Sequence, residues 1–403
     1  MRVLWIASMF PHTVNWLAGP WNIRGTVALR DFEGHDVRVV CPLGMVPPPS
    51  LLKKSLARPA LLKTWFDEHD AAPRTDVVEG IPVTYPRWAW GPKKLLWGYE
   101  GWLMYRQLRG HLAGVVREFR PEVIHTPWLS PEGVCASLMG REHGIPVVAQ
   151  GIGNDANYYL HEFPHRGYVI KELRKTSALL FNCQSTQRNA ELAGLTHPNT
   201  HVIYHGVEVD LFKPDPARTE FGRRIVTVAQ LIPRKNHQLL LHAFTKLPAD
   251  LQRTASLLFV GGGPLKERLE QQAAELGIAD RVTVAGRLSH EDMIREMQRS
   301  DVYCLPTLSE GMPVATIEAM SVGLPVIASR VDGLPETILE PTCGILVPPG
   351  DVDALAAALT DALARNWDRR AIRDHVLQNY TWELFARKIT ELYRNVQPTV
   401  ARQ

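Results

Sequence analysis

The chain has 403 residues, of which 45% are hydrophobic and 22% charged, and its formal net charge is +3. This length is two to three times that of a typical domain and predicts two domains, each with its own core. The small net charge does not indicate nucleic acid, and no stretch reaches the roughly 18 to 20 apolar residues of a membrane span. We therefore expect a protein without a nucleic-acid partner that is cytoplasmic or peripheral to a membrane. Five scattered cysteines without a CxxC pair favour buried thiols in a reducing compartment.

Short β-branched runs, each followed by a helical pattern, recur along the first half of the chain. They are VLWIAS at 3–8, DVRVVCP at 36–42, EVIHTP at 122–127, IPVVAQ at 145–150, ALLFNC at 178–183 and HVIYHG at 201–206. Runs without polar alternation are typical of strands that are covered on both faces. The first half is therefore predicted to be a doubly wound α/β domain with a parallel sheet.

The same pattern returns in the second half. The runs are RIVTVAQ at 224–230, SLLFVGGG at 256–263, RVTVAG at 281–286, DVYCLPT at 301–307 and PVIASR at 325–330. The polar segment 207–224, with two prolines, is the candidate linker. Ligands of such sheets bind beyond the carboxyl ends of the strands, so two facing sheets would put both sets of loops into one cleft. A final amphipathic helix is predicted over 382–393, capped by Thr381.

The densest group of candidate site residues lies between Leu305 and Glu336. A strand ends near Pro306 and a helix is predicted to begin near Pro313, so that the amides of Gly311, Met312 and Val314 would favour a phosphate. Two carboxylates follow, Glu310 in the loop and Glu318 in the helix, and they would bind hydroxyl groups rather than phosphate. The alternatives are a capping role for Glu310 and a solvated surface position for Glu318.

Cationic and glycine-rich loops follow the first two strands of this half. Arg234 and Lys235 come directly after the first strand, where they could neutralise a diphosphate; alternatively they form a solvated basic turn. Gly261 to Gly263 follow the next strand and allow backbone to approach a nucleotide, although glycine turns end many strands. The Asp351-x-Asp353 sequence opens a predicted helix, which favours N-capping over metal binding.

A stretch rich in aromatic and basic residues runs from Arg87 to Arg109. It mixes four tryptophans and two tyrosines with lysines and arginines and a single acid, Glu100. This composition suits the headgroup layer of an anionic membrane. The alternative is a core helix with a basic edge, which would bury Trp97 and Trp102.

Taken together, these motifs resemble those of a known family. The segments QLIPRKNHQLLLHAF, VGGGPLKERL, AGRLSHEDM, EGMPVATIE, GLPVIAS and CGILVPPGD resemble the nucleotide-sugar domain of the retaining glycosyltransferases of the family 4 type, also called glycosyl transferases group 1. PEVIHTPWLSPEGVCASLMGREHGIPVVAQG and HVIYHGVEVDLFKP are similar to the acceptor domain and the interdomain segment. The resemblance covers nearly the whole chain and is strongest to the subgroup of teichuronic acid glycosyltransferases.

The resemblance implies two Rossmann-like domains facing across a cleft, the GT-B fold. Residues 1–206 would bind the acceptor and residues 207–380 the nucleotide sugar, with the helix in 381–403 packing back on the first domain. The reaction implied is retaining, metal-independent transfer from a UDP, GDP or similar donor to a lipid-linked or saccharide acceptor, in surface polysaccharide biosynthesis. The protein would need no cofactor and would lie on the inner face of the cell membrane.

The resemblance also implies roles for individual residues. Lys235 and Arg234 would hold the diphosphate, Glu310 the transferred sugar and Glu318 the ribose. The remaining donor contacts would come from Gly19, Gly262, Arg287, Gly311, Met312, Pro313 and Val314. His125 and Asp155 would lie on the acceptor side.

Three positions depart from the family pattern. Gln230 stands where the family has an arginine, Pro127 follows Thr126 where many members have a second histidine, and His205 replaces an asparagine. Two other classes of function stay open at this point: a nucleotide-sugar isomerase of the same architecture, and a non-catalytic scaffold docked at the membrane. Release of nucleotide from a donor would separate a transferase from a scaffold.

Overall fold

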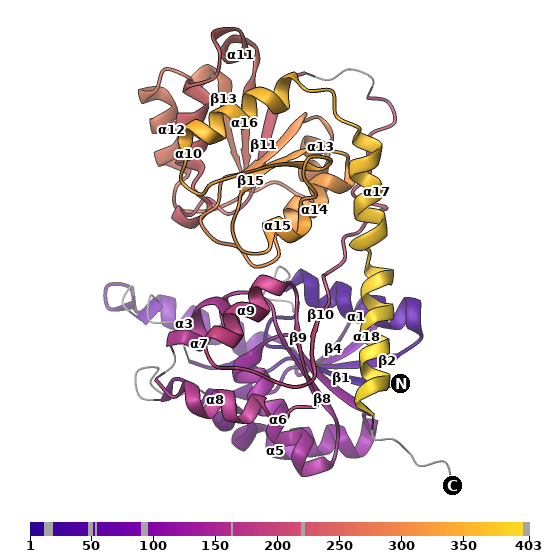
Figure 1. The fold of residues 1–403 in the computed structure, drawn as a ribbon. Coiled ribbons are helices and arrows are strands. Elements are labelled where there is room, and N and C mark those ends of the chain that lie inside the picture. Colours follow the sequence, from indigo (N-terminus) through magenta and orange to yellow (C-terminus); the bar gives the residue numbers. More distant parts are fainter. Residues whose placement is uncertain are drawn as a thin grey trace. The chain divides into compact units, whose positions relative to one another are not determined.

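The computed structural model describes residues 1–11, 19–46, 51–52, 55–89, 96–162, 164–218 and 222–397. The chain divides into two compact units: unit 1 is Met1–Tyr204 with Trp382–Gln403, and unit 2 is His205–Thr381 (Figure 1). Both units are mixed α/β with parallel sheets, as the strand and helix pattern predicts. Unit 2 begins two residues before the boundary expected from the sequence.

Unit 1 is built on a large twisted sheet. Within the described residues this sheet has the strand order β10-β9-β8-β7-β1-β2-β5-β4, with every pair parallel except β4 and β5. The strands are β1 (Arg2–Ile6), β2 (Asp36–Val40), β4 (Thr75–Val78), β5 (Ile81–Thr84), β7 (Val123–Thr126), β8 (Val147–Gly151), β9 (Ala178–Phe181) and β10 (Thr200–Val202), while β3 (Leu43–Gly44) pairs with β6 (Arg87–Trp88). The helices are α1 (Pro20–Glu33), α3 (Ala60–Ala71), α5 (Glu100–Phe119), α6 (Val134–His143), α7 (Leu160–Glu162), α8 (Arg166–Leu173), α9 (Gln184–Leu192) and α18 (Trp382–Val396), with short helical turns at Leu129–Gly133 and Asp155–Tyr159.

The side chains of the central strand β1 show that both faces of this sheet are covered. Successive side chains of a strand point to opposite faces, so Val3 and Trp5 join one apolar cluster while Leu4 and Ile6 join the other. The first cluster contains side chains of α1 and α18, and the second contains side chains of α5 and α6. The predicted final helix is thus present, and it completes the core of unit 1.

The sequence runs did not identify the antiparallel edge formed by β4 and β5. These strands are joined by Glu79 and Gly80, both with positive φ (47° and 79°). A two-residue turn of this conformation matches the twist of a hairpin. The available signal in the sequence was the alternation of the apolar Ile81 and Val83 with Pro82 and Thr84 along β5.

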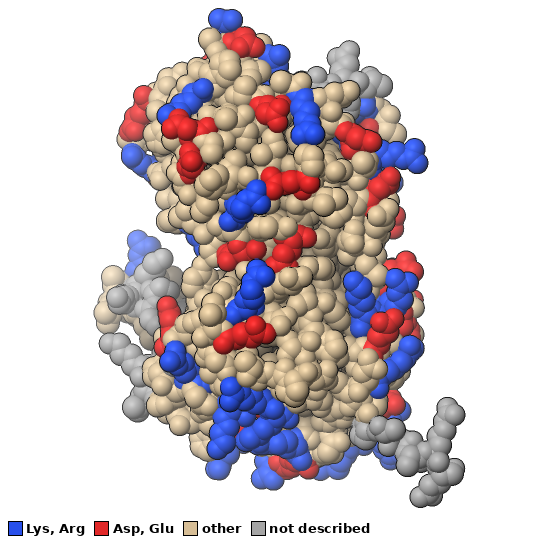
Figure 2. Space-filling view, viewed as in Figure 1, with Lys and Arg blue, Asp and Glu red and all other residues tan. Residues whose placement is uncertain are grey.

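Helix α5 contains most of the described part of the aromatic and basic stretch, of which residues 90–95, including Lys93 and Lys94, lie outside the described residues. Trp88 is buried in one apolar cluster of unit 1, and the partly buried Trp97 packs against another. Trp102 is 39% exposed, and the guanidinium of Arg106 lies 5.3 Å from its ring centroid. Lysine and arginine side chains gather near α5, α6 and α8 (Figure 2). No described helix is long and apolar enough to cross a bilayer.

Unit 2 contains a fully parallel sheet. Within the described residues its strand order is β13-β12-β11-β14-β15-β16. The strands are β11 (Arg224–Val228), β12 (Ser256–Val260), β13 (Val282–Gly286), β14 (Val302–Leu305), β15 (Val326–Ser329) and β16 (Gly344–Val347). The helices are α10 (His237–Thr245), α11 (Ala249–Thr254), α12 (Lys266–Glu275), α13 (His290–Gln298), α14 (Val314–Ser321), α15 (Leu334–Thr337), α16 (Val352–Ala364) and α17 (Arg369–Asn379), with single turns at Pro233–Lys235 and Ala279–Arg281. Helices α10 and α16 pack together, as do α14 and α17.

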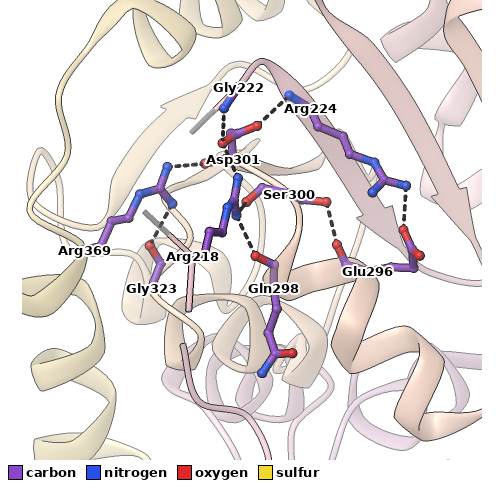
Figure 3. A network of polar contacts seen from close by, with 9 residues as sticks. All are labelled: Arg218, Gly222, Arg224, Glu296, Gln298, Ser300, Asp301, Gly323 and Arg369. Atoms are coloured by element: carbon purple, nitrogen blue, oxygen red, sulfur yellow. Dashed lines mark hydrogen bonds and ion pairs between the residues drawn. The ribbon is translucent and has the colours of Figure 1, made fainter. Parts of the chain in front are cut away.

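The segment expected to be a linker is instead anchored to unit 2 over its described residues. Phe212 is buried, and its carbonyl accepts hydrogen bonds from Ser321 and Arg373. Asp301 holds the end of the segment: its carboxylate pairs with Arg218 at 2.5 Å and accepts the backbone N–H of Arg224 at 2.8 Å (Figure 3). A buried aromatic side chain and a carboxylate that accepts several hydrogen bonds therefore hold the described residues of the predicted linker against unit 2.

Two smaller expectations are confirmed. All five cysteines are buried free thiols. Asp351 is the N-cap of α16, and its carboxylate accepts the N–H groups of Asp353 and Ala354.

Candidate active site

Lys235 and Glu310 meet at the carboxyl edge of the sheet in unit 2. After β11 the chain makes one helical turn, Pro233–Lys235, before α10 begins at His237. The Lys235 ammonium forms an ion pair with Glu310 Oε1, and the two side chains are only 13% and 8% exposed. The structure thus brings together two predicted site residues that are 75 positions apart.

Arg234 ties the loop after β11 to the loop after β14. Its carbonyl accepts hydrogen bonds from Leu308 N at 2.8 Å and Thr307 Oγ1 at 3.1 Å, and its guanidinium donates to Ser309 O at 3.3 Å. Strands β11 and β14 are neighbours although β12 and β13 lie between them in sequence, so this is where the strand order reverses. Open α/β sheets bind ligands at such a point.

Asp332 is a site residue that the sequence interpretation missed. It follows β15, and its Oδ2 accepts hydrogen bonds from Glu310 N at 2.7 Å and Ser309 Oγ at 2.8 Å. Its φ of 46° lies in the left-handed region, where Asp and Asn are enriched among residues other than glycine. Asp332 therefore fixes the backbone that presents Glu310, and the Asp-Gly pair after a strand was the available signal for a turn.

Helix α14 begins at Val314, directly after the loop that contains Gly311 and Met312. Pro313 is its N-cap, and no side chain caps the helix. The first amides of a helix lack partners within it and carry partial positive charge, which suits a phosphate. The alternative reading of Glu310 as a capping acid is therefore wrong.

Glu318 lies one turn inside α14. Burial, together with the negative charge of the nearby Glu208, raises the pKa of its carboxyl to about 8. The alternative reading of a solvated surface residue is wrong. A partly buried carboxyl that holds a proton near neutral pH can both donate to and accept from a hydroxyl group.

The glycine loop after β12 packs directly on the backbone after β11. Gly261 has φ 148°, and a Cβ there would lie 1.9 Å from Ala229 O, so no other residue fits. Gly262 O accepts Leu231 N at 3.0 Å, and the Arg287 side chain lies beside Gly262. The predicted Gly262 and Arg287 are thus brought to the same edge as Lys235.

Comparison with known proteins identifies the family of this chain. The family model for glycosyl transferases group 1 matches residues 210–376, and the model for glycosyltransferase family 4 matches residues 27–211. A GDP-mannose-dependent alpha-(1-6)-phosphatidylinositol monomannoside mannosyltransferase of Mycolicibacterium smegmatis is 34% identical over 287 residues, 64% of this chain and 69% of that protein. The chain belongs to the family of glycosyl transferases group 1.

Another relative and a solved structure match a larger share of the chain. TuaC of Bacillus subtilis, named as a glycosyltransferase of teichuronic acid biosynthesis, is 24% identical over 89% of this chain and 88% of its own. The crystal structure of Anabaena Alr3699/HepE in complex with UDP superposes with a TM-score of 0.70 at 20% identity, covering 98% of this chain and 100% of that chain. These likenesses agree with two Rossmann-like domains of the GT-B type.

In unit 1 the glycosyltransferase holds the two predicted acceptor-side residues in structural roles. His125 is fully buried and stacks on Trp5 at 4.0 Å; its Nδ1 lies 2.8 Å from Tyr393 Oη and its Nε2 3.1 Å from Gln150 Oε1. Asp155 is also buried, and its carboxylate accepts three backbone N–H groups, from residues 129, 152 and 153. Burial raises the pKa of Asp155 to about 6 against these hydrogen bonds. Because both groups are engaged in the core, they do not reach an open surface.

Gly19 is the N-cap of α1. Its φ is 61°, and a Cβ there would lie 2.2 Å from Met9 O, so the loop after β1 and the helix can approach this closely only with glycine. Two of the three departures from the family pattern, Gln230 and His205, lie in unit 2. Gln230 is exposed, and His205, whose pKa burial lowers to about 4, is buried with its backbone N–H donating to Met312 Sδ at 3.3 Å.

Among the described residues, no group of three or more His, Cys, Asp or Glu side chains is arranged to hold a metal ion.

Proposed function

We propose that the glycosyltransferase moves a sugar from a nucleotide-diphosphate donor to a lipid-linked or saccharide acceptor, with retention and without a metal ion. The observation that carries the proposal is the meeting of Lys235, Arg234 and the N-terminus of α14 beside Glu310. Cations and helix amides are concentrated where a leaving diphosphate gains charge, and a carboxylate stands next to them for the sugar.

Five of the predicted residues have a task on the donor in this proposal. Lys235 leaves its partner Glu310 for the diphosphate, and Glu310 accepts hydroxyl groups of the transferred sugar. Glu318 binds the ribose, while Arg287 and Gly262 flank the base. Asp332 touches no substrate, and it keeps Glu310 in place through the backbone.

In the proposed step the bond between the anomeric carbon and the diphosphate breaks, and the acceptor oxygen bonds to the same face of that carbon. The acceptor's proton passes to the departing diphosphate, so that the step needs no side chain as base. The protein contributes the electrostatic stabilisation of the leaving group through Lys235, Arg234 and the α14 amides.

The nucleotide and the pathway rest on the relatives. The mycobacterial relative is named for GDP-mannose, and Alr3699/HepE was crystallised with UDP. TuaC is named for the assembly of a surface polymer. A UDP or GDP donor and a role in cell-surface polysaccharide biosynthesis follow as parts of the proposal.

The proposal places the glycosyltransferase in the cytoplasm, peripheral to the inner face of the cell membrane. Its support is the exposed Trp102 with Arg106 on α5, together with the exposed Arg109 on α5, Arg141 on α6 and Arg174 at the end of α8. Arg109 and Arg141 also form ion pairs with Glu142 and Glu172. A tryptophan beside arginines suits a headgroup layer of anionic lipid. Arg87, by contrast, donates hydrogen bonds to backbone carbonyls, and Trp88 packs in the core. Neither residue therefore takes part in the proposed membrane contact.

The test is release of nucleotide from a panel of UDP and GDP sugars, preceded by a screen for thermal stabilisation by each donor. A transferase releases UDP or GDP from the stabilising donor and passes the sugar to an acceptor. A scaffold releases none, and an isomerase returns an altered nucleotide sugar without releasing free nucleotide; either result would reject the proposal.

A further inference from the structure

An open pocket lies at the amino edge of the sheet in unit 2, with a volume of about 500 Å³. Its wall contains Arg224, the first residue of β11, and Ser256, the first residue of β12. Lys235 and the glycine loop follow the other ends of these strands. Each strand is five residues long, which separates the two edges of the sheet by roughly 16 Å. The pocket is therefore distinct from the candidate active site.

Positive side chains predominate on the wall of this pocket. Among the described residues, four arginines and two aspartates line it. Arg223 and Arg224 stand at the start of β11, and Arg299 is the C-cap of α13. Their side chains are 38%, 32% and 67% exposed, so all three reach solvent. Cations from two separate elements thus line one open space, which favours an anionic ligand.

Asp301, one of the two aspartates, is already hydrogen-bonded through both carboxylate oxygens (Figure 3). Its Oδ1 accepts Arg218 Nη2 at 2.5 Å and Gly222 N at 2.9 Å, and its Oδ2 accepts Arg224 N at 2.8 Å. Asp301 is only 4% exposed, so the pocket meets a carboxylate whose charge is compensated within the protein. The other aspartate, Asp215, is exposed to water, which screens its charge. The two acids therefore do not offset the four arginines.

The exposed arginines are only partly paired with acids. The Arg224 guanidinium lies 2.5 Å from Glu296 Oε2, and the Arg299 guanidinium lies 3.6 Å from Oε1 of the same carboxylate, so two cations share one acid. The Arg223 guanidinium lies 3.8 Å from Asp250, which is 64% exposed. Ion pairs this exposed contribute little to stability. A multiply charged anion can therefore take their place at small cost.

The donors on this wall suit phosphate oxygens. A guanidinium group binds phosphate through two parallel N–H donors, and such charge-assisted hydrogen bonds are roughly twice as strong as neutral ones. Ser256 adds a hydroxyl group to the same wall. A single phosphate fills one such fork, whereas these arginines stand on two elements around a wide space. The arrangement fits an anion whose charge is spread over several phosphate groups.

We propose that this pocket binds an oligophosphate chain, held by Arg223, Arg224 and Arg299. The inference goes beyond the proposed transferase function, because the site is separate from the loops assigned to the donor. The volume lies within the roughly 300–1,000 Å³ of pockets that bind small molecules. Arg218 and Asp301 touch no phosphate in this proposal, and they hold the wall in shape through their ion pair.

The experiment is a calorimetric titration of the full chain with sodium tripolyphosphate, compared with inorganic phosphate. We expect one site that binds tripolyphosphate at least tenfold more tightly than inorganic phosphate. The loops around Lys235 can also attract a phosphate chain, so the titration is repeated on Lys235→Met. The proposed site should persist in that variant.

The double variant Arg223→Gln with Arg299→Gln removes two exposed cations of the wall, and it should weaken tripolyphosphate binding at this site at least tenfold. Arg268→Gln is the matched control, because Arg268 is a 52% exposed arginine of α12 that does not line the pocket; it should change nothing. If the double variant fails to fold, Ser256→Asp serves instead. It keeps every arginine and places a carboxylate on the wall, which should weaken binding to a similar extent.

Unchanged tripolyphosphate binding in the double variant would overturn the inference, as would the absence of any binding to the wild type. Equal weakening by Arg268→Gln would show that only net charge matters, and loss of the site in Lys235→Met would place it at the donor loops; each result also overturns the inference. So would equal affinity for inorganic phosphate and tripolyphosphate. Nucleotide release, measured in parallel, tests the proposed function alone.

Discussion

Replacement of Lys235 separates stability from catalysis in unit 2. Lys235→Met keeps the apolar stem and removes the charge, which leaves the Glu310 carboxylate buried without its cation. Breaking a buried pair in this way costs about 3 to 5 kcal/mol. In a domain of this size each kcal/mol lowers the melting temperature by about 2–4 °C, so the transition of unit 2 should fall by at least about 6 °C. Turnover should fall by roughly two orders of magnitude or more, the effect of losing one charged transition-state contact.

The double variant Lys235→Met with Glu310→Gln tests the stability effect by itself, because both residues are assigned to the donor. The uncharged pair should recover most of the lost melting temperature in calorimetry, but not the rate of nucleotide release. Lys246→Met removes a lysine that pairs with Asp353 at the surface, and it should change stability by no more than about 0.5 kcal/mol. Full turnover in the folded Lys235 variant, or recovery of turnover together with stability, would refute the assignment of Lys235 to the leaving group.

Four further outcomes are expected. Because the pKa of Glu318 is raised to about 8, the folded state binds more protons than the unfolded chain above about pH 4.5, so thermal stability should decline from pH 5.5 to 8.5, and less so in Glu318→Gln. Gly261→Ala should abolish stabilisation by the donor, whereas Gly110→Ala on α5, where a Cβ meets nothing, should be neutral or stabilising. A chelator should leave transfer nearly unchanged. Arg106→Glu should weaken binding to anionic vesicles in a salt-dependent manner while turnover on a soluble acceptor is preserved.

The controls and contrary results are equally specific. If thermal stability depends on pH in the same way in Glu318→Gln and in the wild type, other groups cause the decline. Donor binding by Gly261→Ala would show that the glycine loop can rearrange to accommodate a Cβ. Strict dependence of transfer on magnesium or manganese would reject the metal-free step. For the vesicles, Lys246→Met is the control for a lost surface cation far from α5 in sequence. Equal binding to neutral and anionic vesicles would remove the electrostatic docking proposal.

The sequence was most informative where buried strands end in chemically distinctive residues. The apolar runs predicted each strand around Lys235 and Glu310, and both residues were expected in loops at the carboxyl ends of these strands, where such sheets bind ligands. Asp332 could not be found in the same way, because its role depends on a loop that returns from another strand to the backbone of Glu310. No periodicity records such a contact.

In unit 1 the sequence was less informative about the site residues. His125 and Asp155 were expected beside the acceptor from the family pattern, but their immediate neighbours in the core take up their hydrogen-bonding groups. Glu132 follows His125 by seven residues, yet nothing in the letters Ser-Pro-Glu-Gly distinguishes a capping acid from a buried carboxyl with one unpaired oxygen. Only the hydrogen-bond partners seen in the structure make that distinction.

The return of α18 to unit 1 has a consequence for how the protein is made. A ribosome completes all residues of unit 2 before it reaches Trp382, so unit 2 can fold while unit 1 still lacks Phe385, Ile389 and Tyr393 from its core. His125, synthesised early, waits for Tyr393 as its hydrogen-bond partner until about 270 further residues have emerged. The domain that begins the chain is therefore the last to be finished, and a stop codon just after unit 2 would release a protein whose second half is folded and whose first half is not.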